Sequence, residues 1–324
     1  MMASIVESRV ASSVAATACT ALSRRAFTTT AGGSLASEIV GKVDDAEEEW
    51  VFLHGVLGSR RNWRTWARRF AQDAAPTNIR CCLVDLRNHG DSSTSFHPPA
   101  GPNTIEAAAE DIATMITSRS RQEGQPRIGG LLGHSLGGKI ALRALERLPP
   151  DAMPRQAWII DSNPGRTPSH AGRVDDTRTV FDTLAGVDPS RFSKQSEVFD
   201  HLLDVGLSAA IAQWLCSSLE DRGSAGGLAW KFRVEACREM YESFKQTDAM
   251  AVLERPPQGT TIHVVRGGRS SRLDADEPAI LRLDADPGVA VRYHTIAHAD
   301  HWVHVDAPQE LKALVIDHAF ARGA

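Results

Sequence analysis

The stretch Gly133-His134-Ser135-Leu136-Gly137 decides the fold of this chain, because it has the pattern G-x-S-x-G at a junction between a strand and a helix. The apolar run from Arg127 to Leu132 is typical of a short strand, and apolar residues recur at every fourth position from Leu136 to Leu148. The flanking glycines allow the two backbones to approach closely, so the serine hydroxyl stands clear of the sheet. The pattern predicts that Ser135 is an activated nucleophile. An ordinary glycine-rich turn with an incidental serine is the alternative.

The composition is that of an ordinary globular protein, with 324 residues, 42% of them hydrophobic and 23% charged. This length suits one large α/β domain or two small ones. The net charge of -4 gives no reason to expect a nucleic-acid partner, and no apolar run is long enough to predict a transmembrane segment. The five cysteines show neither a disulfide framework nor the spacing of metal ligands, so we expect no metal site.

The first 37 residues differ from the rest of the chain. They are rich in alanine, serine and threonine, and they carry three arginines and a single acid, Glu7. This composition is typical of an organellar transit peptide. The stretch Arg24-Arg25-Ala26-Phe27-Thr28 resembles a mitochondrial processing site. We therefore predict a transit peptide at residues 1–37 and a mitochondrial location, with the chloroplast as the alternative destination and a disordered tail as the alternative structure.

Predicted strands and helices alternate over most of residues 38–324. The strands are expected at Trp50–Leu53, Arg80–Val84, Arg127–Leu132, Ala157–Ile160, Thr261–Val265 and Val289–Ile296. Helices are expected at Asn62–Phe70, at Thr104–Ser118, after Ser135 and at Pro308–Phe320. This alternation predicts one α/β domain with a mostly parallel, doubly wound sheet. Reactive groups in such sheets gather at the carboxyl ends of the strands.

The alternation stops between Asp161 and Thr260. Three segments there have helical patterns without strands between them, at residues 173–184, 197–220 and 229–244. We predict an all-helical insertion at the carboxyl edge of the sheet, forming a helical lid at about residues 162–258 over the site. Alternatively, the inserted helices pack on an outer face of the domain and do not cover the site.

A serine hydroxyl needs a base that takes its proton. The segment from Ala297 to His304 follows the last predicted strand and precedes the last helix, which is where the histidine lies in the chain order serine, acid, histidine. We predict that His301 is this base. His298 and His304 flank it, and we expect each to be a solvated or structural histidine.

A carboxylate is expected beside the base, because it fixes the imidazole tautomer and stabilises the imidazolium. Asp161 ends the strand before the insertion and lies at the same edge of the sheet as His301. The turn after Thr261–Val265 contains no carboxylate until Asp274, which is a further candidate. Asp161 is our first choice. The alternative role for Asp161 is to cap the turn at Ser162-Asn163-Pro164.

Four motifs together resemble one family of serine hydrolases. They are His54-Gly55-Val56-Leu57-Gly58-Ser59, Asp85-Leu86-Arg87-Asn88-His89-Gly90-Asp91-Ser92, Gly133-His134-Ser135-Leu136-Gly137-Gly138-Lys139 and His301-Trp302-Val303-His304. From about Trp50 to Phe320 the chain is similar to the α/β-hydrolases grouped with α/β-hydrolase domain-containing protein 11 and its bacterial esterase relatives. The resemblance implies the α/β-hydrolase fold, hydrolysis of esters or thioesters, no cofactor, and a mitochondrial location in eukaryotes.

The family's functional residues carry over onto matching positions of this chain. Ser135 becomes the nucleophile and His301 the base. The backbone N–H groups of Val56 and Leu136 would form the oxyanion hole, with Leu57 as the donor if the turn is shifted by one residue.

The resemblance leaves the acid open. The bacterial relatives have an aspartate at the position of Asp161, whereas Glu235 lies where other relatives carry an aspartate that is sometimes assigned to the triad. This chain also has Ala299-Asp300 before His301, where the relatives usually have glycine next to the histidine.

Other features of the sequence receive structural interpretations. We expect the polar stretch from Asp85 to Ser92 to brace the loop beside the nucleophile, and Lys139 to be a structural or surface cation. Five tryptophans could line an acyl pocket, although core packing is the default interpretation; they are Trp63, Trp66, Trp214, Trp230 and Trp302.

These features predict a serine hydrolase that acts on a small-molecule acyl ester or thioester, with a lipid-like acyl group as the natural fit to a helical lid. A carbon–carbon bond hydrolase or lyase could use the same residues on the same fold, because a fold alone does not select a reaction. A non-catalytic binding protein that retains the fold is the third alternative.

Overall fold

The computed structural model describes residues 35–93, 101–167, 176–223 and 226–320. The predicted transit peptide at residues 1–37 lies almost wholly outside the described residues, so the mitochondrial location stays a prediction. None of the helices in the described segments combines the length and the apolar character that crossing a membrane requires.

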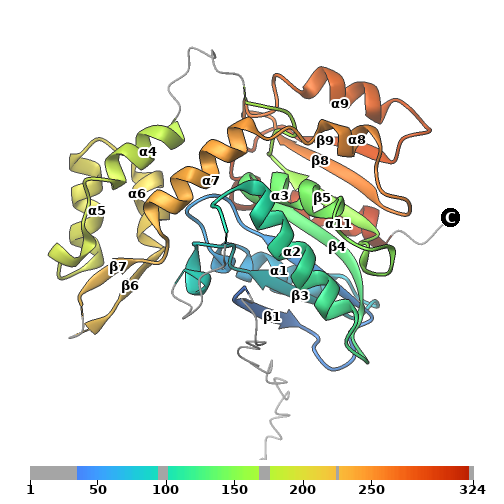
Figure 1. Cartoon of the computed structure of the whole chain (residues 1–324), viewed down its shortest axis with the longest axis horizontal. Helices are drawn as coiled ribbons and strands as arrows, with labels where there is room; N and C mark the ends of the chain where they lie inside the picture. The colour runs from blue at the N-terminus through green and yellow to red at the C-terminus, as the bar shows by residue number, and fades with distance from the viewer. Residues whose placement is uncertain (1–34, 94–100, 168–175, 224–225, 321–324) are drawn as a thin grey trace, which may run out of the picture.

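A seven-stranded sheet forms the centre of the molecule, in the order β1-β3-β2-β4-β5-β8-β9 (Figure 1). Its strands are β1 (Ser37–Gly41), β2 (Glu48–Leu53), β3 (Ile79–Val84), β4 (Arg127–His134), β5 (Gln156–Ile160), β8 (Thr261–Gly267) and β9 (Val291–Ile296). All neighbouring strands are parallel except β1, which pairs antiparallel with β3 at one edge. The prediction of a mostly parallel sheet is therefore confirmed, and β1 is a strand that the sequence pattern did not predict.

Helices cover both faces of this sheet, as the doubly wound pattern requires. The helices α1 (Arg64–Asp73) and α11 (Pro308–Phe320) pack on one face, and α2 (Ile105–Ser120) and α3 (Leu136–Leu145) pack on the other. Successive strand residues point to opposite faces, so Phe52 of β2 joins the first core and Leu53 joins the second. Short helices complete the domain; they are η1 (Arg60–Trp63), η2 (Gly90–Ser92), η3 (Pro150–Ala152), α8 (Met250–Glu254), α9 (Glu277–Asp284) and α10 (Val303–Asp306).

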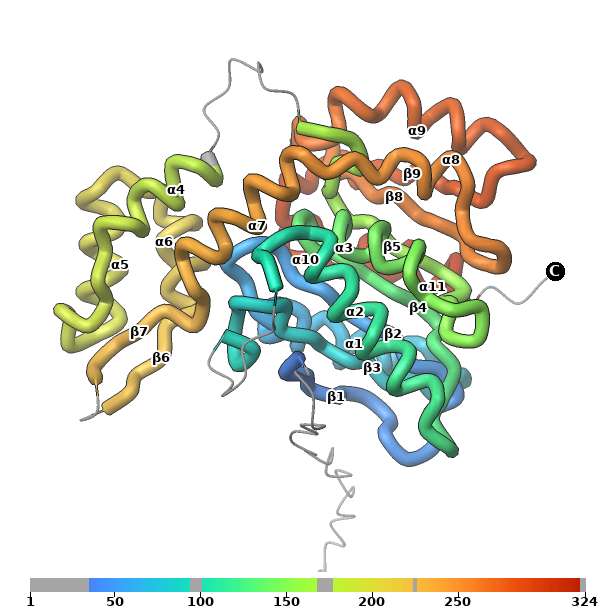
Figure 2. The backbone as a smooth tube through the Cα atoms, viewed as in Figure 1, coloured from blue at the N-terminus to red at the C-terminus, as the bar shows by residue number. Residues whose placement is uncertain are grey.

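The segment between β5 and β8, which we call the insertion, forms a separate group of elements beside the sheet. It contains α4 (Asp176–Leu184), η4 (Pro189–Arg191), α5 (Gln195–Asp204), α6 (Ala209–Cys216), β6 (Leu219–Asp221), β7 (Leu228–Trp230) and α7 (Val234–Gln246), followed by α8. Figure 2 shows α4, α5, α6 and the β6–β7 hairpin together on one side, with α7 leading back across the sheet domain.

The prediction that the insertion contains only helices is wrong. The strands β6 and β7 pair antiparallel, and Gly223 and Gly227 between them have positive φ values of 58° and 65°. The predicted single helix at residues 197–220 is also wrong. Gly206, with a φ of 95°, ends α5, and the Ser208 side chain then caps α6.

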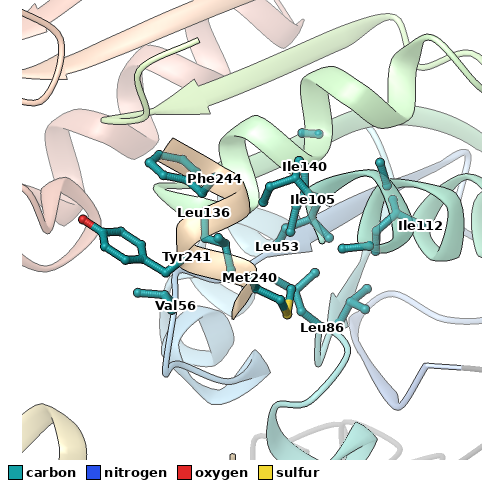
Figure 3. Packing of buried hydrophobic residues seen from close by; sticks show 14 of the residues in the cluster. Leu53, Val56, Leu86, Ile105, Ile112, Leu136, Ile140, Met240, Tyr241 and Phe244 are labelled. Carbon is teal, nitrogen blue, oxygen red and sulfur yellow. The ribbon is translucent and has the colours of Figure 1, made fainter. Parts of the chain in front are cut away.

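The long helix α7 joins the insertion to the core of the sheet domain. Figure 3 shows Tyr241 and Phe244 of α7 beside Val56 and Leu136 in one hydrophobic cluster. Leu136 directly follows the candidate nucleophile, so the insertion packs against the start of the nucleophile helix α3.

Lys139 of α3 fixes this junction by hydrogen bonds. Its side chain is fully buried, and its Nζ donates to the carbonyl oxygens of Gly165 and Phe244 at 2.8 Å and of Thr247 at 3.1 Å. The same ammonium lies 4.0 Å from the ring centroid of Phe244. Lys139 is thus a structural cation, as expected, and it binds both ends of the insertion to α3.

We predict that Lys139→Met lowers the free energy of unfolding by about 3 kcal/mol, because three buried carbonyl groups lose their donor. Chemical denaturation of the full chain measures this change. Lys194→Met, a change of the same type at an exposed lysine, is the control and should alter stability by less than about 0.5 kcal/mol.

The difference in free energy of unfolding between the wild-type protein and Lys139→Met should also depend on pH, which provides a second measurement. Burial lowers the pKa of Lys139 from 10.5 to about 7. Unfolding then takes up a proton between these two values, so the wild-type protein gains stability relative to Lys139→Met as the pH rises through this interval. A difference that stays constant or falls over the same pH range would show that the three hydrogen bonds outweigh burial and keep Lys139 protonated.

Candidate active site

Ser135 occupies a sharp turn between β4 and α3. Its φ is 51°, a left-handed value that a residue other than glycine adopts only under strain. Its backbone N–H donates to the carbonyl oxygen of Ile160 at 2.9 Å, which ties the turn to the end of β5. The serine is therefore held at the carboxyl edge of the sheet, as the strand–turn–helix pattern predicts.

Two glycines make this turn possible. A Cβ on Gly133 would collide with the carbonyl group of Gly137, and a Cβ on Gly137 would lie 2.6 Å from the carbonyl oxygen of His54. Both neighbours are backbone atoms that cannot move aside. The G-x-S-x-G pattern is thus required by the close approach of α3 to β4 and to the end of β2.

His301 and Asp161 meet at the same edge of the sheet. The distance from His301 Nδ1 to Asp161 Oδ2 is 2.7 Å. Asp161 also has a positive φ, 43°, and its carboxylate accepts hydrogen bonds from the Gly267 N–H at 3.1 Å and the Ser270 hydroxyl at 2.6 Å. Because Nδ1 faces the carboxylate, Nε2 is the ring nitrogen of His301 that is left for the serine.

Burial governs the protonation of this pair. It lowers the pKa of His301 well below its usual value of 6.5, and the positive charge of Arg272 acts in the same direction. Burial raises the pKa of Asp161 to about 6, while the hydrogen bonds from Ser270 and Gly267 oppose that rise. His301 is therefore neutral at physiological pH, which is the form that can accept a proton.

The other candidate acids lie elsewhere. The Glu235 side chain is 72% exposed and pairs with Arg238, and Asp274 pairs with Arg266 at 2.7 Å. Neither carboxylate contacts His301 among the interactions of the described residues. Asp161 is the carboxylate that the structure brings to this histidine.

The two flanking histidines also have other partners. His298 is half exposed and lies 3.3 Å from Glu310, and the His304 ring lies 4.4 Å from the Trp63 ring. Both therefore fit the solvated or structural roles expected from the sequence.

The sequence analysis missed two residues that support the histidine. His134, inside the G-x-S-x-G pattern, places its Nε2 2.8 Å from the backbone oxygen of His301. Ser270 holds the Asp161 carboxylate, as described above. His134 was visible as a polar residue at a predicted buried position, whereas nothing in the sequence distinguished Ser270 from Ser271.

The loop that bears His301 packs tightly on the loop after β8. A Cβ on Gly268 would lie 2.5 Å from the carbonyl oxygen of Ala297, so this position needs glycine. Asp300 accepts the N–H of His301 at 2.7 Å. Its side chain thus caps the backbone of the candidate base.

The expected oxyanion donors lie beside Ser135. Leu136 is the first residue of α3, and the first N–H groups of a helix have no partner inside it. In the described part of the chain no acceptor is found for the N–H of Val56, which lines the same cavity as Ser135. The alternative donor Leu57 does not fit, because its N–H donates to His89 Nε2 at 3.0 Å.

The stretch from Asp85 to Ser92 braces this turn, as expected. His89 fixes Leu57 from one side, and the Asp85 carboxylate forms a buried ion pair with Arg60. Gly90 has a φ of 53°, and a Cβ there would collide with Asp85. The motif therefore holds the loop that carries Val56 in position.

A cavity of about 940 Å³ opens above the serine. Ser135, Val56 and His301 line its floor, and residues of the insertion, including Ile211, Trp214 and Tyr241, line its walls. Of the five tryptophans, Trp63, Trp214 and Trp302 line this cavity, whereas Trp66 is buried against Phe52 and Phe70 and Trp230 stacks on Phe232. The walls are large and aromatic enough to accept an apolar acyl chain.

The described residues contain no group of three or more His, Cys, Asp or Glu side chains that could hold a metal ion.

Comparison with known proteins agrees with this geometry. The sequence profile of the alpha/beta hydrolase family matches residues 50–314. The sn-1-specific diacylglycerol lipase ABHD11 of Mus musculus is 29% identical over 80% of this chain and 77% of its own length. Esterase YbfF of Escherichia coli (strain K12) is 26% identical over 80% of this chain and 87% of its own length.

A solved marine microorganism esterase has the same fold, with a TM-score of 0.71 and 23% identity over 88% of this chain and 98% of that one. The family profile covers most of the chain and includes Ser135, Asp161 and His301. This chain therefore belongs to the alpha/beta hydrolase family.

Proposed function

We propose that the protein is a serine hydrolase that cleaves carboxylic esters or thioesters of acyl, lipid-like groups through an acyl-enzyme. The observation that carries the proposal is the 2.7 Å contact of Asp161 with His301, which lines the same cavity as Ser135. The names of the relatives, a diacylglycerol lipase and an esterase, support the same class of substrate.

Acylation begins when Ser135 Oγ attacks the substrate carbonyl carbon. Its proton passes to His301 Nε2, and Asp161 stabilises the resulting imidazolium through Nδ1. The carbonyl oxygen becomes an oxyanion. The N–H groups of Val56 and Leu136 are the proposed donors to it, and each such donor is worth about 3 kcal/mol in the transition state.

The tetrahedral intermediate then collapses. The bond between the carbonyl carbon and the alcohol or thiol breaks, and the leaving group takes the proton from His301 Nε2. Water attacks the acyl-enzyme next, with His301 again as the base, and the carboxylic acid is released as Ser135 recovers its proton. No cofactor enters these steps.

The insertion would act as a lid over this chemistry. Its residues Ile211 and Trp214 line the cavity opposite Ser135, so closing the insertion over the substrate would exclude water and offer an apolar surface to the acyl chain. We further propose the mitochondrial location that residues 1–37 predict.

We predict that Ser135→Ala lowers kcat/KM for p-nitrophenyl esters at least a thousandfold, because no other group can form the acyl-enzyme. Asp161→Asn should cost about ten thousandfold in kcat, because the wrong tautomer of His301 is then favoured. Ester hydrolysis by the full chain, with esters and a thioester of graded chain length, measures both changes.

Asp274→Asn and Glu235→Gln are the matched controls, since each neutralises a carboxylate that contacts neither Ser135 nor His301. Both should keep kcat/KM within about twofold of the wild-type value. Full esterase activity in Ser135→Ala, or a loss in Glu235→Gln as large as in Asp161→Asn, would contradict the assignment.

The loss of activity at low pH should reflect the protonation of His301 or Asp161. Because burial and Arg272 lower the pKa of His301 below 6.5, we expect kcat/KM to stay constant from about pH 8 to 7. It should then fall at a midpoint below 6.5, as His301 or Asp161 gains a proton. Measurement of kcat/KM against pH in the free enzyme tests this expectation.

Arg272→Gln should move that midpoint upward, since it removes a positive charge that disfavours the imidazolium. Arg269→Gln, the same change at an exposed arginine of the same loop, should leave the midpoint in place. A wild-type midpoint above pH 7 would contradict the lowered pKa of His301. The same midpoint in Arg272→Gln as in the wild type would contradict the effect of Arg272 on that pKa.

A further inference from the structure

The cavity contains a cation that the proposed mechanism does not use. Arg272 lies in the segment between β8 and α9, and it lines the cavity together with Ser135 and His301. Its side chain is half-buried. A guanidinium in such a place is normally paired with a carboxylate, because removing a charge from water is costly.

Arg272 has no carboxylate partner among the described residues. Its hydrogen bond there is a long one of 3.4 Å, from Nη2 to the hydroxyl of Thr177 in α4. Arg266, six positions earlier, shows the contrast. It forms ion pairs with Asp274 and Glu277 and donates to the carbonyl oxygen of Ser270 at 3.1 Å.

Two carboxylates, those of Asp300 and Asp306, also line the cavity, and neither forms an ion pair with Arg272 in the described part of the chain. Asp300 accepts the N–H of His301 at 2.7 Å, and Asp306 accepts the N–H of Asp300 at 2.9 Å. Arg269 is exposed and adds a second positive charge to the rim. The side of the cavity formed by the β8–α9 segment is therefore positive.

The charge of Arg272 also reaches the reacting groups. It lowers the pKa of His301 and that of Asp161, so the guanidinium is close enough to influence both. A group bound by Arg272 would thus lie near the carbonyl that Ser135 attacks.

We propose that Arg272 determines specificity by binding an anionic group, a carboxylate or a phosphate, on the ester or thioester substrate. This inference rests on the proposed function. Arginine presents several N–H donors in a planar fork that matches such anions in a bidentate arrangement. The apolar walls would take the acyl chain, and the positive side would take the anionic end of the acyl group or of the leaving group.

The test compares three esters at pH 8, where His301 is neutral. They are p-nitrophenyl hexanoate, mono(p-nitrophenyl) adipate with a carboxylate on the acyl side, and 3-carboxy-4-nitrophenyl hexanoate with one on the leaving group. Arg272→Gln should lower kcat/KM about tenfold for one of the charged esters, mainly through KM, and change the neutral ester less than twofold. Arg272→Lys should retain part of the preference, because it keeps the charge.

The ester that responds identifies the side that carries the anion. Arg282→Gln, at an exposed arginine of α9 that does not line the cavity, is the control for a simple change of net charge, and it should alter all three esters by less than about twofold. Thermal unfolding of each variant shows whether it is folded. Equal losses on all three esters in a folded Arg272→Gln protein, or no loss on either charged ester, would overturn the proposal.

Failure of the proposed function gives a different result. In that case none of the three esters is hydrolysed in a way that depends on Ser135. Calorimetric binding of adipate to Ser135→Ala, with and without Arg272→Gln, then still tests the anion site. Binding that Arg272→Gln weakens about tenfold supports the site, and binding that is unaffected or absent refutes it.

Discussion

The close approach of three backbones at the end of β4 is the constraint on which the rest of the site depends. Gly133 and Gly137 let α3 start directly against β4 and the end of β2, and Ser135 is forced into a left-handed conformation between them. The same contact directs the first N–H groups of α3 toward the serine. A side chain at either glycine would separate the helix from the sheet and would remove the nucleophile, the donors and the cavity floor together.

Buried neutral histidines hold the loops around this turn. Burial lowers the pKa of His54 to about 4 and that of His89 to about 3, so both can accept backbone N–H groups at neutral pH. His54 accepts from Leu86, His89 from Leu57, and His134 contacts the carbonyl oxygen of His301. These rings connect the ends of β2, β3, β4 and β9.

Much of the fold followed from local patterns. Strands buried on both faces read as short apolar runs, so most strands of the parallel sheet were predictable, whereas β1 is partly exposed and β6 and β7 have only three residues each. Ser135 and His301 were identified because their neighbours along the chain define their positions. Ser270 was missed, since a hydroxyl that holds a carboxylate 109 positions away leaves no local pattern.

The sequence by itself determined the turn at Ser135, the positions of most strands along the chain and the choice of His301, because each depends on residues that are adjacent in the chain. Only the tertiary structure shows which of Asp161, Glu235 and Asp274 contacts His301, since the distances of these carboxylates to His301 depend on how segments far apart in the sequence align. It likewise shows that Lys139 is an internal anchor and that Arg272 faces the cavity without a carboxylate partner among the residues that the structure describes. Charge and burial are properties of a three-dimensional environment, and segments far apart in the sequence create that environment.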